Sequence, residues 1–250
     1  MAINEVPLDD VPVRRVSAGR NFDHRFFFVV AILFPLTILI GFGPTFYLKP
    51  LFNTPPIART VIAVHGALMT FWVLMFITQV YLISSKRIRV HQKLGILAAV
   101  LAPLIIVTGW LTAIGAAKYG SPSAPPIPPL EFMIVPFADM VVFAVLLGAA
   151  IYYRKNAPTH KRLILLTVIN FIPPAIARFP GGLTADYGPL WFFGVPTVLT
   201  LALIIADTWR NKKLNVPFLC GGIFMIASMW LRLPLSSTQP WLNFAAWLTS

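Results

Sequence analysis

ILAAVLAPLIIVTGWLTAIG, residues 96–115, is a run of 20 residues without a charged side chain. About 20 apolar residues in a helix span the hydrocarbon core of a bilayer, and this run lacks the polar–apolar alternation of a membrane barrel strand. It therefore predicts a transmembrane helix. Outward from it, apolar runs of similar length predict seven spans in all, at 26–46, 58–84, 92–117, 130–153, 162–179, 189–209 and 216–234.

The composition also indicates a membrane protein. The chain is 58% hydrophobic and 11% charged, whereas a soluble domain is about a quarter charged. In a membrane protein, the net charge of +12 indicates basic cytoplasmic loops, so we do not expect nucleic acid as a partner. The single cysteine, Cys220, excludes a disulfide framework and a thiolate metal cluster, because each needs at least two cysteines.

The distribution of lysine and arginine predicts the orientation. One set of span ends carries 15 of them, namely Arg14, Arg15, Arg20, Arg25, Lys86, Arg87, Arg89, Lys93, Arg154, Lys155, Lys161, Arg162, Arg210, Lys212 and Lys213. The opposite ends carry five, namely Lys49, Arg59, Lys118, Arg178 and Arg232. Because cytoplasmic loops are enriched in these residues, the larger group and the N-terminus are predicted to be cytoplasmic.

The predicted fold is an all-α, polytopic transmembrane helix bundle in a bacterial inner (cytoplasmic) membrane. Residues 1–25 form a polar cytoplasmic N-terminal arm and residues 26–234 the seven-helix transmembrane domain. Residues 235–250 form an outer tail, in which Trp241 and Trp247 favour an interfacial helix over an eighth span.

Two histidines are candidate metal ligands. His91 and His160 lie at matching depth at the cytoplasmic starts of the third and fifth spans. Two axial ligands of a membrane haem b would need this placement, and Arg162 could pair with a haem propionate. The alternative is that each is an interfacial histidine among basic residues.

A second set of candidates follows one face of the second span. His65, Met69, Trp72, Phe76 and Gln79 recur at helical spacing. In a soluble helix this stripe would be ordinary core. In a membrane helix, a histidine and a glutamine at its two ends indicate a face that lines the bundle interior, where a cofactor, a quinone or a proton route could lie. His65 and Gln79 are therefore candidate cofactor-binding residues.

Four ionisable residues are predicted to share the outer half of the bundle: His65, Asp139, Arg178 and Arg232. Asp139 lies roughly 14 Å deep at a rise of about 1.5 Å per residue. An ionisable group at that depth costs several kcal/mol unless it is paired. The four residues predict a buried polar cluster, which is either a binding site or a set of ion pairs that fixes helix register.

The sequence lacks the motifs of several well-known classes of enzyme and cofactor protein. The chain has no HExxH zinc motif, no GxSxG nucleophile and no glycine-rich phosphate loop. Seven helices would also suit a retinal protein, but its Schiff base needs a lysine in the last span. Residues 216–234 contain none, so retinal is excluded.

Five segments in a fixed order carry a resemblance: FYLKPLF (46–52), HGALMTFW (65–72), VHQKLG (90–95), THKRL (159–163) and PPAIARFP (173–180). Together they resemble a family of uncharacterised bacterial multi-pass membrane proteins with HGxLxTxW, HxKLG and HKRL segments. The resemblance implies the fold and no activity.

The scattered histidines are also similar to those of membrane cytochromes b, although diheme reductases need two histidine pairs on four helices. At most one bis-histidine haem fits, and His65 would need another partner such as Met133.

The leading functional hypothesis is a haem-b-binding protein, or one otherwise associated with membrane electron transfer. The first alternative is a non-catalytic subunit or assembly factor of a larger membrane complex. A transporter is the third, and the lack of detectable internal repeats disfavours it. The expected partners are the lipid bilayer and either a larger membrane complex or a quinone.

Overall fold

The computed structural model describes residues 13–121 and 126–250, with side chains from Arg25 onward. The described residues form helices and no strand, in agreement with the all-α prediction. In chain order the elements are α1 (Val13–Phe42), η2 (Gly43–Tyr47), α2 (Lys49–Phe52), α3 (Thr60–Ser84), α4 (Ile88–Tyr119), α5 (Pro129–Phe132), α6 (Ile134–Tyr152), η3 (Tyr153–Lys155), α7 (Ala157–Asn170), α8 (Pro173–Ile176), α9 (Leu183–Tyr187), η4 (Leu190–Gly194), α10 (Val195–Asn211), α11 (Val216–Leu235) and α12 (Gln239–Thr249).

Six helical segments in the described part of the chain are long and apolar enough to cross a membrane: Arg25–Tyr47, Thr60–Ser84, Ile88–Tyr119, Pro129–Lys155, Leu190–Asn211 and Val216–Leu235. Large apolar side chains cover their outer faces, and Phe71, Ile96 and Ile205 are each more than 60% exposed. Such a surface is unfavourable in water and is suited to lipid chains. The chain is an integral multi-pass membrane protein.

The sequence predicts one continuous helix for the fifth span, 162–179, and the structure differs from this. The residues of this span belong to two helices, α7 of 14 residues and α8 of four, separated by a turn. Pro173 and Pro174 lack the N–H groups that would continue α7, and their rings clash with the preceding turn. Helix α7 is shorter than a bilayer is thick, and all its residues from Leu165 to Asn170 are buried.

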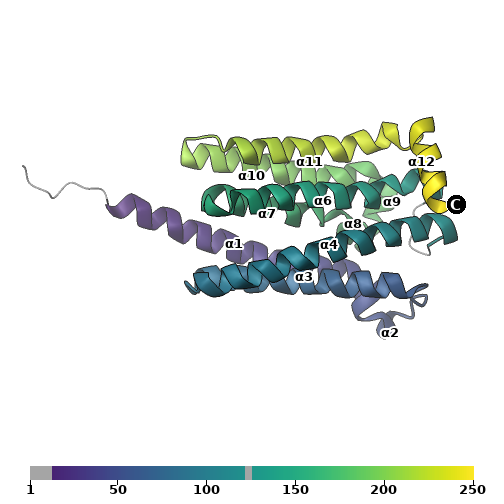
Figure 1. Cartoon of the computed structure of the whole chain (residues 1–250), viewed down its shortest axis with the longest axis horizontal. Coiled ribbons are helices and arrows are strands. Elements are labelled where there is room, and N and C mark those ends of the chain that lie inside the picture. Colours follow the sequence, from purple (N-terminus) through teal and green to yellow (C-terminus); the bar gives the residue numbers. More distant parts are fainter. Residues whose placement is uncertain (1–12, 122–125) are drawn as a thin grey trace, which may run out of the picture.

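At both ends of the chain, helices extend beyond the predicted spans, although the first candidate membrane span, Arg25–Tyr47, agrees with the predicted 26–46. Helix α1 begins at Val13, well before the first predicted span, and residues 1–12 of the predicted arm lie outside the described residues. The tail contains α12, which runs across the end of the bundle (Figure 1). Trp241 Nε1 donates a hydrogen bond to the Leu130 carbonyl over 2.9 Å. With 11 residues α12 is too short to cross a bilayer.

Helices α6 and α7 lie in the middle of the bundle. Figure 1 shows α1, α3 and α4 on one side of them and α10 and α11 on the other. On the first side, the buried ring of Phe143 packs 5.0 Å from Trp72 and 4.8 Å from Phe171, measured between centroids. On the second side, Leu166 packs in one apolar core with Met225. The two cores are joined through α6 and α7.

Helices α1 and α8 touch through their backbones. A Cβ added at Gly41 would overlap the carbonyl oxygen of Ala175, so no larger residue fits without a backbone shift. Close backbone approach at glycine is a common way for membrane helices to pack. This contact holds the broken helix against α1 and places Phe42 and Arg178 beside each other.

Candidate functional site

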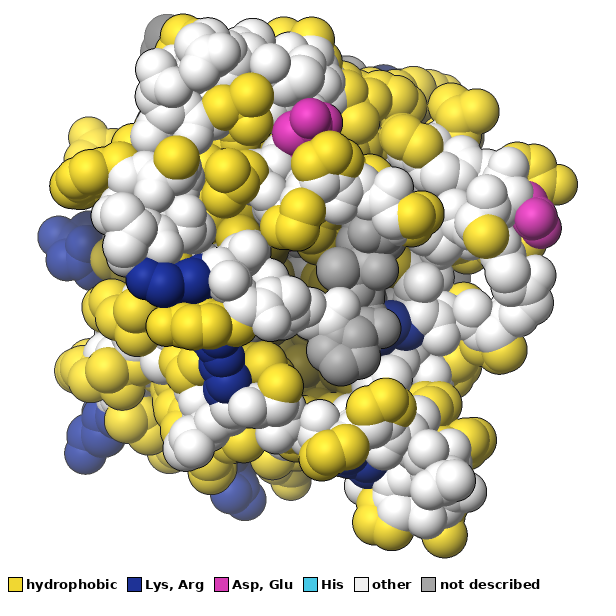
Figure 2. All heavy atoms as spheres, turned by 90° about the vertical axis from the view of Figure 1, so that its right-hand side faces the viewer, with side chains coloured by type: hydrophobic (Ala, Val, Ile, Leu, Met, Phe, Trp, Pro, Cys, Tyr) yellow, Lys and Arg dark blue, Asp and Glu magenta, His cyan; other side chains and the backbone are white. Residues whose placement is uncertain are grey.

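The bundle has two chemically different ends. The turns between α3 and α4, α6 and α7, and α10 and α11 gather at one end, called here the basic end because they carry Lys86, Arg87, Arg154, Lys155, Lys212 and Lys213. Helices α2, α9 and α12 lie at the other, called here the α12 end (Figure 1). Figure 2 looks onto the α12 end, where acidic side chains are sparse among apolar and cationic ones.

At the basic end, the first turns of α4 and α7 bring two imidazole rings together. The ring centroids of His91 and His160 are 6.5 Å apart, with an angle of 78° between the ring planes. The two residues that the sequence places at matching depth are therefore also neighbours across the bundle.

Hydrogen bonds around the pair orient one ring and leave the other incompletely satisfied. His160 Nδ1 lies 2.8 Å from the carbonyl oxygen of Ala150. If Nδ1 carries the proton and donates it there, Nε2 keeps a lone pair, as in most metal-bound histidines. Gln79 Nε2 donates to the His91 carbonyl over 3.3 Å. His91 Nδ1 and Gln79 Oε1 are buried without a partner among the described residues, which is rare for polar atoms.

The pair can be compared with the axial ligands of a haem. Within residues 13–121 and 126–250, no group of three or more His, Cys, Asp or Glu side chains is placed to hold a metal ion. An iron about 2 Å from one nitrogen of each ring separates the centroids by roughly 6 Å. The observed centroid separation of 6.5 Å is close to this value.

Arg162, the predicted propionate partner, has a different partner in the structure. Its Nη2 lies 2.6 Å from Asp207 Oδ1, and its Nε donates to Asp207 Oδ2 over 2.8 Å. This bidentate geometry is the strongest that an arginine and a carboxylate form. It ties α7 to α10, so the guanidinium already serves in helix packing.

The four residues of the predicted outer cluster separate into a pair and two single groups. Arg232 Nη1 lies 2.6 Å from Asp139 Oδ1, and both side chains are less than 10% exposed. His65 Nδ1 instead lies 3.0 Å from Thr108 Oγ1. The Arg178 guanidinium carbon lies 4.6 Å from the centroid of the Phe42 ring. The cluster is therefore not a single hydrogen-bonded network.

Met133, the suggested partner of His65, lies elsewhere. It is buried in a small apolar core with Ala113 of α4 and Ala245 of α12. On a neighbouring helix, the methionine near His65 is Met140 of α6, because both side chains lie against Gly109 of α4. The structure therefore gives His65 a different sulfur neighbour from the one that the sequence suggests.

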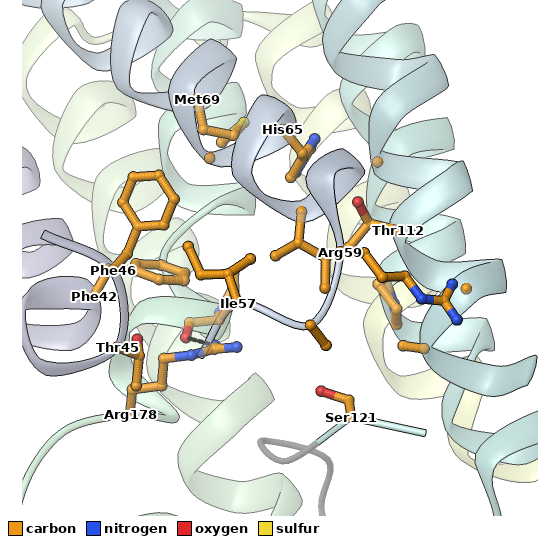
Figure 3. Close-up of a pocket in the computed structure, with 18 of the residues that line it drawn as sticks. Phe42, Thr45, Phe46, Ile57, Arg59, His65, Met69, Thr112, Ser121 and Arg178 are labelled. Atoms are coloured by element: carbon orange, nitrogen blue, oxygen red, sulfur yellow. Dashed lines mark hydrogen bonds between the residues drawn. The ribbon is translucent and has the colours of Figure 1, made fainter. Parts of the chain in front are cut away.

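A cavity of about 330 Å³ lies at the α12 end. Its walls come from α1 with η2, α3, α4, α6 and the α8 region, and three members of the predicted cluster, His65, Asp139 and Arg178, line it. In Figure 3, His65 and Met69 enter from α3, and Arg178 extends in from the lower left, below Ile57. The volume is at the lower end of the range of small-molecule sites.

Two hydroxyl groups of this cavity are absent from the sequence-based prediction. Thr45 Oγ1 and Thr112 Oγ1 are buried without a hydrogen-bond partner among the described residues, and both side chains line the cavity. Thr112 could have been found, because it follows Gly109 by three residues on the same face of α4. Thr45 lies in η2, a short π-helix that no sequence pattern announces.

Comparison of the chain with protein-family models, with curated proteins and with solved structures found no match. The residues of the two sites therefore carry the functional argument.

Proposed function

We propose that the protein is a haem-b-binding membrane protein of electron transfer, in which His91 and His160 would hold the haem iron. The observation that carries this proposal is the 6.5 Å separation of the two imidazole centroids. The Ala150 carbonyl supports it, because a bond from Nδ1 frees His160 Nε2 for a metal. When bound, the haem supplies one-electron redox chemistry.

The residues around the pair hold and orient the ligands. The bond from Gln79 to the His91 carbonyl joins α3 to the first turn of α4. One turn further along α4 lies Gly95. A Cβ added at Gly95 would have Gln79 Nε2 as its nearest neighbour, at 3.8 Å. A glycine at this position keeps bulk away from the face of α4 that carries His91, as a flat macrocycle requires.

The proposed topology has seven crossings, with the basic end in the cytoplasm of a bacterial cell. Helices α7 and α8 form the fifth crossing as a broken helix shielded from lipid by its neighbours. Membrane proteins tolerate such breaks where the backbone is buried in protein. The lysines and arginines of the three turns at the basic end support this orientation.

The ligand assignment is tested by haem content. Wild-type protein and the variants His91→Ala, His160→Ala and His65→Ala are purified from haem-replete cells, and the haem per polypeptide is measured. We expect about one haem in the wild type and in His65→Ala, and loss of haem in the other two. His65 is the matched control because it is a histidine of the same bundle that lines the cavity at the opposite end. Haem retained by both His91→Ala and His160→Ala, or lost only from His65→Ala, contradicts the assignment.

A further inference from the structure

The cavity at the α12 end contains a cation without a counter-ion. Among the described residues Arg178 has no carboxylate partner; its Nη1 donates to the Pro174 carbonyl over 2.5 Å, and its guanidinium packs on Phe42. A guanidinium has five N–H donors. Most of the donors of this side chain are therefore unused at a position that lines the cavity.

The balance of charge around the cavity is positive. Lys49 and Arg59 line it together with Arg178, and Asp139, the one acidic residue among the described lining residues, is already paired with Arg232. Lys49 donates to Thr54, and Arg59 packs on the Tyr119 ring with 3.6 Å between its guanidinium carbon and the centroid. Figure 3 shows Arg59 directed away from the middle of the cavity, whereas Arg178 extends from the lower left toward it. Arg178 is thus the cation that a bound molecule would meet.

The inner part of the cavity is apolar. Its lining there includes Met69, Val73, Met140 and Phe171. At the α12 end, the lining residues Pro55, Pro56 and Gly120 are exposed, so the cavity reaches the surface of the described residues there. A molecule that fills it needs a polar group near Arg178 and an apolar body that reaches between α3 and α6.

We propose that this cavity binds an amphipathic anion, with its carboxylate or phosphate group on Arg178 and its apolar body between α3 and α6. The two buried hydroxyl groups without partners, of Thr45 and Thr112, supply further donors for its polar atoms. A guanidinium suits both a carboxylate and a phosphate, because each accepts its parallel N–H groups. This inference does not depend on haem at the basic end.

The experiment titrates decanoate into the full-length protein in a neutral detergent and measures heat. Decanol is the matched uncharged ligand, and Arg178→Gln is the test variant. Lys118→Gln is its control, because Lys118 is a cation at the same end that does not line the cavity. Uptake of decanoate by the micelles is the same for every variant, so differences report on the protein.

We expect decanoate to bind about tenfold or more weakly to Arg178→Gln than to the wild type and to Lys118→Gln, since a hydrogen bond to a charged group is lost. Decanol should bind the wild type no better than it binds Arg178→Gln. Equal decanoate affinities for the wild type and Arg178→Gln overturn the proposal. If Arg178→Gln does not fold, Thr45→Val and Thr112→Val take its place, and unchanged affinity in both overturns it.

A further arm separates two sources of the anion. Nanodiscs of phosphatidylglycerol are compared with nanodiscs of phosphatidylcholine. Weaker decanoate binding in phosphatidylglycerol alone identifies a lipid headgroup as the natural occupant. Equal binding in both lipids, still dependent on Arg178, identifies a free amphipathic anion. Binding in either lipid that does not depend on Arg178 contradicts the proposal.

Discussion

Arg232 of α11 and Asp139 of α6 form a buried ion pair, with 2.6 Å between Nη1 and Oδ1. Arg232 Nη1 also donates to the Val135 carbonyl over 3.1 Å, so α11 is tied both to a side chain and to the backbone of α6. The pair therefore joins α6, in the middle of the bundle, to α11. Each of the two charges would be costly at this depth in the membrane without the other as its partner.

Removing the carboxylate should destabilise the bundle strongly. Asp139→Ala strands the Arg232 cation, which is 2% exposed, and we expect a loss of about 3–5 kcal/mol in the free energy of unfolding in detergent micelles. The double variant Asp139→Ala, Arg232→Met should lose less than the sum of the two single variants, because no charge remains unpaired. Asp186→Ala is the control, since this exposed carboxylate should change stability by less than about 0.5 kcal/mol. Strict additivity in the double variant would mean that the two charges are not coupled.

The Arg162–Asp207 pair predicts that substitutions of Arg162 lower the stability of the protein without changing its haem content. Arg162→Ala should lower the free energy of unfolding by about 1–3 kcal/mol, because two charged hydrogen bonds are lost. Arg162→Lys should recover only part of this, since an ammonium cannot form the planar bidentate contact. Both variants should keep the haem content of the wild type. Loss of haem with unchanged stability would favour a propionate contact for Arg162 instead.

The contact between α1 and α8 predicts that two glycine-to-alanine substitutions have different effects on stability. Gly41→Ala forces a methyl group into the backbone of Ala175 and should destabilise the protein by about 1–3 kcal/mol. Gly148→Ala is the matched control on α6, where an added Cβ meets nothing within 4 Å. This control should be neutral or slightly stabilising, because alanine favours a helix over glycine. Thermal unfolding of both variants measures the difference, and equal effects would place α8 elsewhere.

The proposed topology predicts which residues a membrane-impermeant maleimide reaches. In a Cys220→Ser background, Ser250→Cys should react in intact spheroplasts, whereas Lys213→Cys should react only after the cells are broken. Both positions are exposed, so accessibility within the protein does not separate them. The opposite pattern would invert the bundle.

Much of the fold follows from hydropathy, because the long apolar runs coincide with six helical segments that could cross a membrane. The interior face of α3 was also predictable from helical spacing, and Trp72 and Phe76 are indeed buried. The break after Asn170 was not predicted, because single prolines usually only kink a membrane helix. Here Pro173 and Pro174 stand together and end it.

The side-chain partners were less accessible to sequence reasoning. Depth alone offers Asp139 three candidate partners, and the choice of Arg232 depends on the rotation and tilt of α6 and α11, which hydropathy does not encode. The pairing of Arg162 with Asp207 joins residues 45 positions apart on α7 and α10. The cavity is lined by residues of several helical segments far apart in the sequence, so its threonines could not be recognised as a group.

The central claim is that His91 and His160 bind one haem b, and a reduced-minus-oxidised absorption spectrum of the purified wild type tests it most directly. Two imidazole ligands give a low-spin, six-coordinate iron, so the account predicts a Soret band and a sharp α band on reduction. A colourless protein from haem-replete cells, or a bound haem whose spectrum shows an open axial position, contradicts it.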